Sequence, residues 1–188
     1  EFRRVLFRSV NKKALHDINN IIEGKDNNNN SIVLGTKSMA TESNSIALGH
    51  GTFSLSKNSM AFGSFSYVKG DNSLGLGVDS KILSNNSIAI GTRAGVGYNS
   101  ANSLVMGNFS YSTGENALVF GNKSKVTAKD GLAIGSNSEA SLANSTALGV
   151  NSKTDYTKED LEKDGYAPRG VLSMPSTEKI GVISVGSK

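Results

Sequence analysis

The chain has 188 residues, with 20 Lys plus Arg against 16 Asp plus Glu, 21 Gly, no Cys, no Trp and only 6% aromatic residues. This composition excludes a disulfide framework and a thiolate metal site, and it disfavours a thick, aromatic-rich core. The net charge of +4 is weak evidence for nucleic-acid binding, which needs cations clustered on one face, because residues 30–149 carry 8 basic and 6 acidic side chains.

The segment before Asn30 is expected to lie outside the main fold. Residues 1–9 (EFRRVLFRS) lack the apolar core of a signal peptide and resemble foreign or linker sequence, so we leave them out of the fold prediction. In residues 10–29, the apolar side chains from Leu15 to Ile22 follow helical spacing before a linker. A short amphipathic helix there would either cap the following fold or belong to a preceding segment. No apolar run is long enough to predict a transmembrane helix.

Residues 30–152 contain nine copies of a hexamer with an NSIALG-like pattern. The glycines that end the copies are Gly35, Gly49, Gly63, Gly77, Gly91, Gly107, Gly121, Gly135 and Gly149. Their numbers rise in steps of 14, with a single step of 16 between Gly91 and Gly107. Such self-similarity indicates a solenoid in which each period is one rung. The longer interval predicts a small loop insertion around Gly97 and Tyr98.

Each rung is predicted to hold two strands of about five residues joined by two short turns. In the hexamer strand, alternation is expected to place a pair of large apolar side chains inside the roll. Examples of such pairs are Ile46 with Leu48 and Met60 with Phe62. The small residue between them, Ala47 or Ala61, would then face outward and let another chain approach closely.

The second strand of a rung is predicted to place small side chains inside, at the third and fifth positions after the repeat glycine. Ser66 with Val68 and Ser138 with Ala140 follow this pattern. The asparagine that opens most hexamers tolerates the left-handed conformation of a turn, and stacked asparagines can bond from rung to rung. A thin roll leaves apolar surface exposed, so oligomerisation is the natural way to bury it.

Residues 153–179 break the repeat and are predicted to form a charged loop or cap. Thr157 is a candidate N-cap of a short helix, with Asp160 in its first turn. The segment would either shield the open end of the roll or contact a ligand.

The repeat resembles the YadA-like head repeat of trimeric autotransporter adhesins. The likeness lies in the hexamer followed by two residues and a serine, as in Asn144-Ser-Thr-Ala-Leu-Gly149-Val-Asn-Ser152, and it covers residues 30–152. Within residues 180–188, the stretch from Gly181 to Ser187 (GVISVGS) looks like the start of the family's neck, which this sequence would contain only in part.

This resemblance implies an all-β fold, a left-handed parallel β-roll (solenoid) of about nine 14-residue rungs, that assembles as a homotrimer. It also implies a surface adhesin on a Gram-negative outer membrane, attached only through a C-terminal anchor that this sequence lacks. The implied partners are other copies of the chain and a host matrix protein (collagen, fibronectin or laminin type) or a carcinoembryonic-antigen-type cell adhesion receptor. Nucleic acid is not among them.

Catalytic chemistry is not predicted. The two histidines, His16 and His50, have no cysteine to pair with, and His50 lies between glycines in a predicted turn. The glycines at Gly75 and Gly77 do not continue into a full nucleotide-binding pattern. We therefore expect a protein that is not an enzyme and that needs no metal or cofactor.

The predicted ligand-binding residues are Phe53, Phe65, Tyr67, Phe109 and Tyr111. Alternation in the second strand should point them away from the interior, and exposed aromatic side chains dominate protein recognition. Cations at corresponding positions would supply a polar rim: Lys37, Lys81, Arg93, Lys123 and Lys125. The alternative is that the aromatic rings pack on a neighbouring subunit or on one another across rungs.

Other repeat proteins fit the sequence less well. A trimeric acyltransferase on a hexapeptide β-helix needs about 18 residues per coil, and a calcium-binding nonapeptide roll needs glycine-aspartate repeats that are missing here. The serious alternative to an adhesin head is a structural spacer in a trimeric surface fibre that presents another binding tip.

Overall fold

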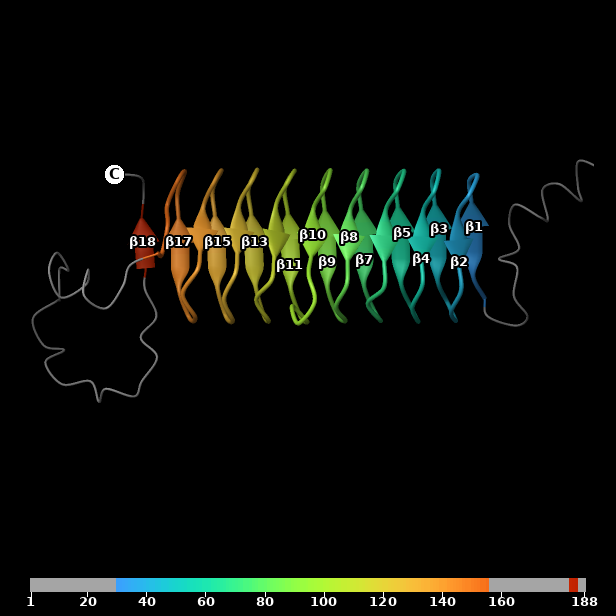
Figure 1. Ribbon diagram of the computed structural model, residues 1–188, viewed down its shortest axis with the longest axis horizontal. Coiled ribbons are helices and arrows are strands. Elements are labelled where there is room, and N and C mark those ends of the chain that lie inside the picture. Colours follow the sequence, from blue (N-terminus) through green and yellow to red (C-terminus); the bar gives the residue numbers. More distant parts are fainter. Residues whose placement is uncertain (1–29, 156–182, 186–188) are drawn as a thin grey trace, which may run out of the picture.

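The computed structural model describes residues 30–155 and 183–185, which form a straight parallel β-solenoid (Figure 1). All described strands belong to two parallel sheets. The chain passes from one sheet to the other along its length, so that the second sheet's 8 strands correspond to about eight turns. None of the described residues lies in a helix long and apolar enough to cross a membrane.

The first sheet has 10 strands, and the second sheet has 8. The first sheet consists of β1 (Ile32–Leu34), β3 (Ile46–Leu48), β5 (Met60–Phe62), β7 (Leu74–Leu76), β9 (Ile88–Ile90), β11 (Leu104–Met106), β13 (Leu118–Phe120), β15 (Leu132–Ile134), β17 (Thr146–Leu148) and β18 (Ile183–Val185). The second sheet consists of β2 (Met39–Ala40), β4 (Phe53–Ser54), β6 (Tyr67–Val68), β8 (Lys81–Ile82), β10 (Gly95–Val96), β12 (Tyr111–Ser112), β14 (Lys125–Val126) and β16 (Glu139–Ala140).

The strand register confirms the period read from the sequence. Ala47 pairs with Ala61, which is the equivalent residue of the next hexamer. Between β9 and β11 the register follows the longer interval, with Ile88 opposite Leu104. The extra residues therefore lie after β10, as the repeat predicts. The strands have three residues in the first sheet and two in the second, so they are shorter than the predicted five.

The prediction for the interior of the hexamer strand was wrong. Ala47 and Ala61 are fully buried, whereas Met60 is 39% exposed and Ile46 is half-buried. The hexamer strands therefore turn their middle residue inward, which is Ala or Gly in most rungs and Val at 105 and 119, and their large apolar pair outward. So short a rung encloses too little space for two large side chains per strand, and close packing leaves room for one small residue.

The second strand faces as predicted. Ser66 and Val68 are fully buried, and so are Ser138 and Ala140. The buried serines pair with one another or with backbone carbonyls; for example, the Oγ atoms of Ser66 and Ser80 are 2.7 Å apart. Among the described residues, every buried side-chain nitrogen or oxygen has a hydrogen-bond partner. The interior is thus thin and partly polar but fully satisfied.

Volume is balanced across the interior. Where the second sheet supplies the large side chains of Val68 and Ile82, the first sheet supplies Gly75, and an added Cβ there would lie 2.8 Å from Val68 Cγ2. Where the first sheet supplies Val105 and Val119, the second sheet supplies the small Ser112. At these positions a large residue on one sheet is offset by a small residue on the other, as dense packing requires.

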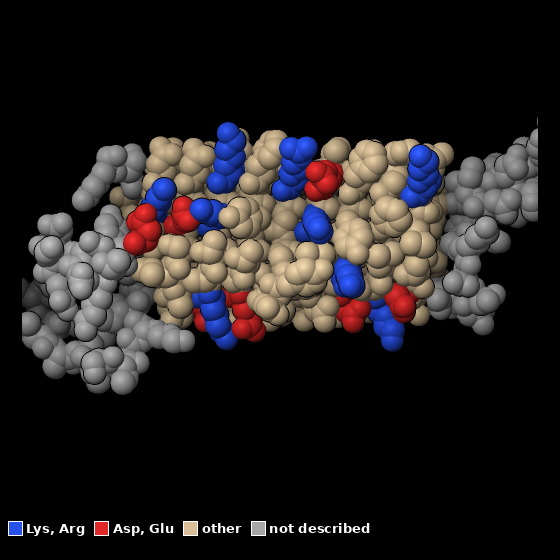
Figure 2. Space-filling model, in the orientation of Figure 1, with Lys and Arg blue, Asp and Glu red and all other residues tan. Residues whose placement is uncertain are grey.

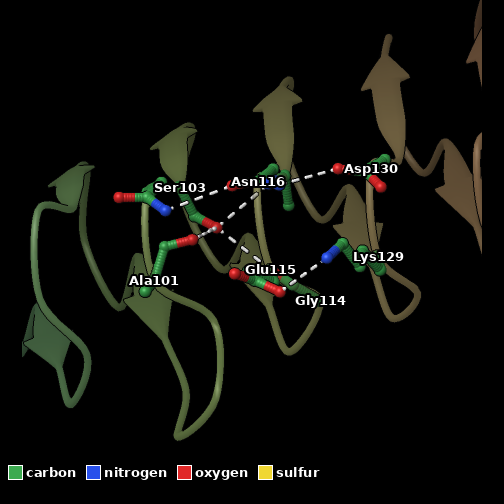
Figure 3. A network of polar contacts seen from close by, with 9 residues as sticks. Ala101, Ser103, Gly114, Glu115, Asn116, Lys129 and Asp130 are labelled. Carbon is green, nitrogen blue, oxygen red and sulfur yellow. Dashed lines mark hydrogen bonds and ion pairs between the residues drawn. The ribbon is translucent and has the colours of Figure 1, made fainter.

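Asparagine ladders join the rungs, as predicted. Asn102 donates from Nδ2 to Asn116 Oδ1 at 3.2 Å, and Asn116 donates to Asp130 Oδ1 at 2.8 Å (Figure 3). The same bond recurs from Asn44 through every rung to Asp130. These residues have positive φ, for example 55° at Asn116, which asparagine tolerates better than most residues. Asparagine thus both adopts the left-handed turn conformation and supplies the hydrogen bonds between rungs.

Several predicted segments lie outside the described residues. These are the helix and linker of residues 10–29, the short helix at Thr157, and residues 180–188 apart from β18. β18 pairs in parallel with β17, with Ile183 opposite Thr146, so it extends the first sheet by one strand.

Candidate functional site

The five predicted ligand-binding residues lie on the outer side of the second sheet. Phe53, Tyr67 and Tyr111 belong to β4, β6 and β12, and their side chains point away from the interior. Phe65 and Phe109 lie in the turns that lead into β6 and β12, and they are 58% and 48% exposed. We call this surface, with the cations at equivalent positions, the aromatic face.

Phe65 and Phe109 adopt a backbone conformation that phenylalanine rarely takes. Their φ angles are 61° and 57°. At the same turn position, two residues after the repeat glycine, three other rungs have Gly51, Asn137 or Asn151, and four have a charged residue, Lys37, Asp79, Arg93 or Lys123. A bulky residue in the left-handed region costs about 1–2 kcal/mol relative to the right-handed one. Every rung therefore has a left-handed residue here, but only Phe65 and Phe109 place an apolar ring in water at a conformation that does not favour it, which is a reason to consider function.

Ring contacts and cations organise the aromatic face. Phe53 and Tyr67 on adjacent strands have ring centroids 6.3 Å apart, and His50 meets Phe65 edge-on at 5.4 Å. Lys81 Nζ lies 5.9 Å from the centroid of the Tyr67 ring. A cation at this distance is attracted to the face of the ring.

The five predicted residues form two groups on the aromatic face. Phe53, Phe65 and Tyr67 lie together around β4 and β6, whereas Phe109 and Tyr111 lie at β12. Between them, β8 and β10 contribute Lys81 and the side-chain-free Gly95. Arg93 extends from the turn before β10, and its Cζ lies 5.6 Å from the centroid of the Phe109 ring. Cations therefore occupy the space between the two aromatic groups.

A shallow hollow of ≈ 240 Å³ opens beside the first aromatic group. Its lining consists of Phe65, Tyr67, Asp79, Ser80, Lys81, Leu83 and Tyr98. Tyr98 is 64% exposed and comes from the inserted residues after β10. The sequence analysis did not identify Tyr98 as a site residue. The sequence does mark this residue, because Tyr98 lies in the single irregular interval between repeat glycines.

Ion pairs neutralise both carboxylates on the aromatic face. Arg93 Nε lies 3.1 Å from Asp79 Oδ2, and Lys125 Nζ lies 2.6 Å from Glu139 Oε1. The hydrogen bond from Lys125 to Glu139 raises the pKa of the lysine above its ordinary value. Within the described residues, Lys37, Lys81 and Lys123 have no ion-pair partner. The face therefore carries free positive charge.

The outer side of the first sheet is different in character. It carries two columns of large apolar side chains and, within the described strands, no charged residue. The most exposed members are Ile32, Leu34, Met60, Leu76, Ile88, Met106, Leu118, Ile134, Leu148, Ile183 and Val185. We call this surface the apolar face. Soluble monomers rarely expose so continuous an apolar surface, which indicates an interface.

Comparison with known proteins supports the repeat architecture. The family model described as "YadA head domain repeat (2 copies)" matches residues 27–52, 56–80, 69–94, 99–124 and 127–152. The crystal structure of the collagen-binding domain of the Yersinia adhesin YadA matches with 24% sequence identity and a TM-score of 0.44, over 82% of this chain and 68% of that chain. No curated protein sequence matches the chain.

The family model decides the assignment, and the looser structural likeness adds nothing about ligands. The matched residues cover more than half of the chain and coincide with the rungs of the solenoid. The chain therefore belongs to the YadA head domain repeat family, whose repeats build adhesin heads.

Proposed function

We propose that this adhesin head is displayed on a bacterial surface and binds a host matrix protein or cell-surface receptor through the aromatic face. The observation that carries the proposal is the pair of exposed phenylalanines at Phe65 and Phe109, held at positive φ where asparagine or glycine would cost less. Residues that lower stability without filling the core are best explained by what they contact outside the chain.

The arrangement suits protein recognition. Aromatic side chains supply the anchors of most protein interfaces, and here they come from a rigid set of paired strands. Phe53 and Tyr67 support one another through their rings, so little side-chain freedom remains to be lost on binding. Lys81 and Arg93 add charge next to the rings. Collagen, fibronectin, laminin and receptor ectodomains are the candidate partners to test.

The apolar face has a different role in this proposal. It packs against equivalent faces of two other copies, as the family resemblance implies, and so removes two columns of apolar side chains from water. The aromatic face, on the other sheet of the thin solenoid, then remains on the outside of the trimer. The two sheets thus divide self-association and ligand binding between them.

A spacer is the alternative function, and the regularity of the solenoid favours it. Rungs paired in one register along the whole described roll make a straight rod that could hold another domain away from the cell (Figure 1). A spacer needs no exposed phenylalanine at positive φ, so substitution of Phe65 and Phe109 distinguishes a spacer from a ligand-binding head.

The experiment measures binding of the 188-residue chain to immobilised matrix proteins and receptor ectodomains. The test variant is Phe65→Asn with Phe109→Asn, which keeps the fold because Asn137 and Asn151 occupy the same turn position with φ 57°. The matched control is Val78→Asn with Val150→Asn, which removes apolar side chains of similar exposure, 49% and 56%, one residue earlier in other turns.

We expect at least one partner to bind the native chain and the control, and to bind the test variant at least about tenfold more weakly. The test variant should unfold at a free energy within about 1 kcal/mol of the native value, because relief of the left-handed strain offsets the lost ring contacts. Equal binding by all three proteins would favour the spacer.

A further inference from the structure

Charge is distributed unevenly around the solenoid. Among the described residues, the outer positions of the second sheet and the turns leading into it carry six cations and two carboxylates. The cations are Lys37, Lys81, Arg93, Lys123, Lys125 and Lys153, and the carboxylates are Asp79 and Glu139. The opposite turn edge, with Lys69 and the equivalent Asp155 beside it, carries three cations and five carboxylates: Lys57, Lys69, Lys129, Glu42, Asp71, Glu115, Asp130 and Asp155.

Figure 2 makes this asymmetry visible. Blue side chains predominate along the upper edge, where red appears beside one of them, whereas red and blue lie together at the left end of the middle and along the lower edge. On the opposite turn edge, Glu115 Oε2 and Lys129 Nζ are 3.0 Å apart and neutralise one another (Figure 3). The excess positive charge therefore belongs to the aromatic face.

The cations on this face follow the axis of the rod. Adjacent rungs are about 4.8 Å apart. Lys81 and Arg93 come from neighbouring rungs, and Lys123 lies two rungs beyond Arg93, with the Phe109 ring between them. Two adjacent columns make up a strip along this axis: Phe65, Asp79, Arg93, Phe109 and Lys123 in the turns, and Tyr67, Lys81, Gly95, Tyr111 and Lys125 in the strands. Arg93 neutralises Asp79, which lines the hollow together with Lys81, so Lys81 and Lys123 supply the free positive charge.

We propose that this strip binds a linear anionic polysaccharide, sulfated or carboxylated, laid along the solenoid axis. The inference rests on the proposed function and deepens it: the part of the host matrix protein or receptor that contacts the strip is a charged glycan chain and not the polypeptide. The unpaired Lys81 and Lys123 complement the repeated charges of such a chain. The rings of Tyr67 and Phe109 accept the C–H faces of sugar rings, and the hollow of ≈ 240 Å³ accommodates one sugar unit.

An acidic polypeptide fits the strip less well. Polypeptides are commonly bound as an added strand at a sheet edge or as a helix in an apolar groove. On the aromatic face, the strands from β4 to β14 already pair on both sides, so the strip offers no free edge. Its surface also interleaves cations with rings, which does not make a continuous apolar groove. The repeated charges instead match a ligand recognised by side chains alone.

The test uses the 188-residue chain, with heparin, chondroitin sulfate, uncharged dextran and poly-glutamate as probes, followed by binding to host cells before and after enzymatic removal of sulfated glycans. The test variant is Lys81→Gln with Lys123→Gln. The control, Lys57→Gln with Lys129→Gln, removes the same net charge from the opposite edge.

We expect heparin to bind the native chain and the control, and to bind the test variant about tenfold more weakly. Dextran should not bind, and about 0.5 M salt should abolish heparin binding.

Four outcomes would overturn the inference. If both variants lose heparin binding equally, net charge and not the strip determines binding. If poly-glutamate binds as tightly as heparin, the ligand is an acidic polypeptide. If the native chain binds cells but neither heparin nor the removal of glycans has an effect, the polysaccharide is wrong while the adhesin function stands. If the native chain binds neither cells nor any probe, the adhesin function fails as well.

Discussion

Side-chain volume selects the residues that face the interior of a rung. Gly75 lies opposite Val68, which fills the space that a side chain at position 75 would take. Gly95 lies in the second sheet with its missing side chain on the outer side, where an added Cβ would be 3.6 Å from the nearest backbone atom. The same residue type therefore has a packing role at one position and none at the other.

Replacing Gly75 by Ala should destabilise the chain. The new Cβ would lie 2.8 Å from Val68 Cγ2 and 3.1 Å from Ser80 Oγ, and overpacking of this kind costs about 1–3 kcal/mol. Gly95→Ala is the control, and it should stabilise the chain by about 0.4–1 kcal/mol because it restricts the unfolded chain without a clash. Denaturant unfolding of both variants checks this prediction, and an equal loss of stability would contradict it.

Lys125 should make stability depend on pH in the alkaline range. Its hydrogen bond to Glu139 raises the folded-state pKa above the ordinary value of 10.5. The stabilising contribution is therefore fully present below pH 10.5 and is lost as the pH rises through the folded-state pKa. Because the pair is partly exposed to solvent, the contribution is at most about 1 kcal/mol.

The measurement compares the native chain with Lys125→Gln at about pH 9 and about pH 11.5 by thermal unfolding. The native chain should be the more stable one at the lower pH, and the difference should shrink at the higher pH. Lys123→Gln, which removes a lysine without an ion pair, should show no such change. A difference that is independent of pH would rule out the ion pair as its source.

At the scale of the elements, turn conformation and the asparagine ladder are coupled. Asn116 has φ 55° and takes part in two ladder hydrogen bonds. Asn116→Gly removes the two hydrogen bonds but keeps the conformation free of strain, whereas Asn116→Ala also introduces a methyl group at positive φ. The alanine variant should therefore be less stable than the glycine variant by about 1 kcal/mol.

Unfolding free energies of the two variants test this coupling. Ala143 is the reference position, because it is also a turn residue but does not have positive φ. Ala143→Gly should lower stability there, so alanine is favoured over glycine at position 143 and disfavoured at position 116. The same order of stability at both positions would show that backbone conformation does not determine the choice.

Much of each rung could be predicted from the sequence, but not which side of the hexamer strand faces inward. The period of the repeat predicted the register, and asparagine chemistry predicted the turns. In the second strand, Ser66 and Val68 alternate with Phe65 and Tyr67, so size separates the two sides. In Ile46-Ala-Leu48 both sides are apolar, and alternation alone leaves the inward side open. The narrow interior favours the alanine on the inward side. This limit on space is visible in the folded rung but not in the sequence.

The outward orientation of the five aromatic residues was predictable, but their arrangement was not. Exposure of the five aromatic residues follows from alternation, whereas their division into two groups depends on Lys81 and Gly95 in the strands between them. The left-handed backbone at Phe65 has no signal in a single rung. It appears only when the equivalent positions of all rungs are compared, and so does the insertion that places Tyr98 beside the hollow.

At the scale of the whole molecule, the two sheets present opposite chemistry on a thin rod. The apolar face consists of large aliphatic and aromatic side chains without charge, and the aromatic face carries rings and unpaired cations. A chain of 19.7 kDa that exposed the apolar face to water would be prone to non-specific association. Our central claim is that the apolar face joins copies of the chain and the aromatic face stays free for a host ligand.

The molecular mass in solution tests that claim most directly. We would measure sedimentation equilibrium of the native chain, of Leu118→Lys on the apolar face, and of Phe65→Asn with Phe109→Asn on the aromatic face. The native chain and the aromatic variant should both sediment at three times 19.7 kDa, and Leu118→Lys should fall toward the mass of a single chain. A native chain that sediments as a monomer, or an aromatic variant that dissociates while Leu118→Lys does not, would contradict the account.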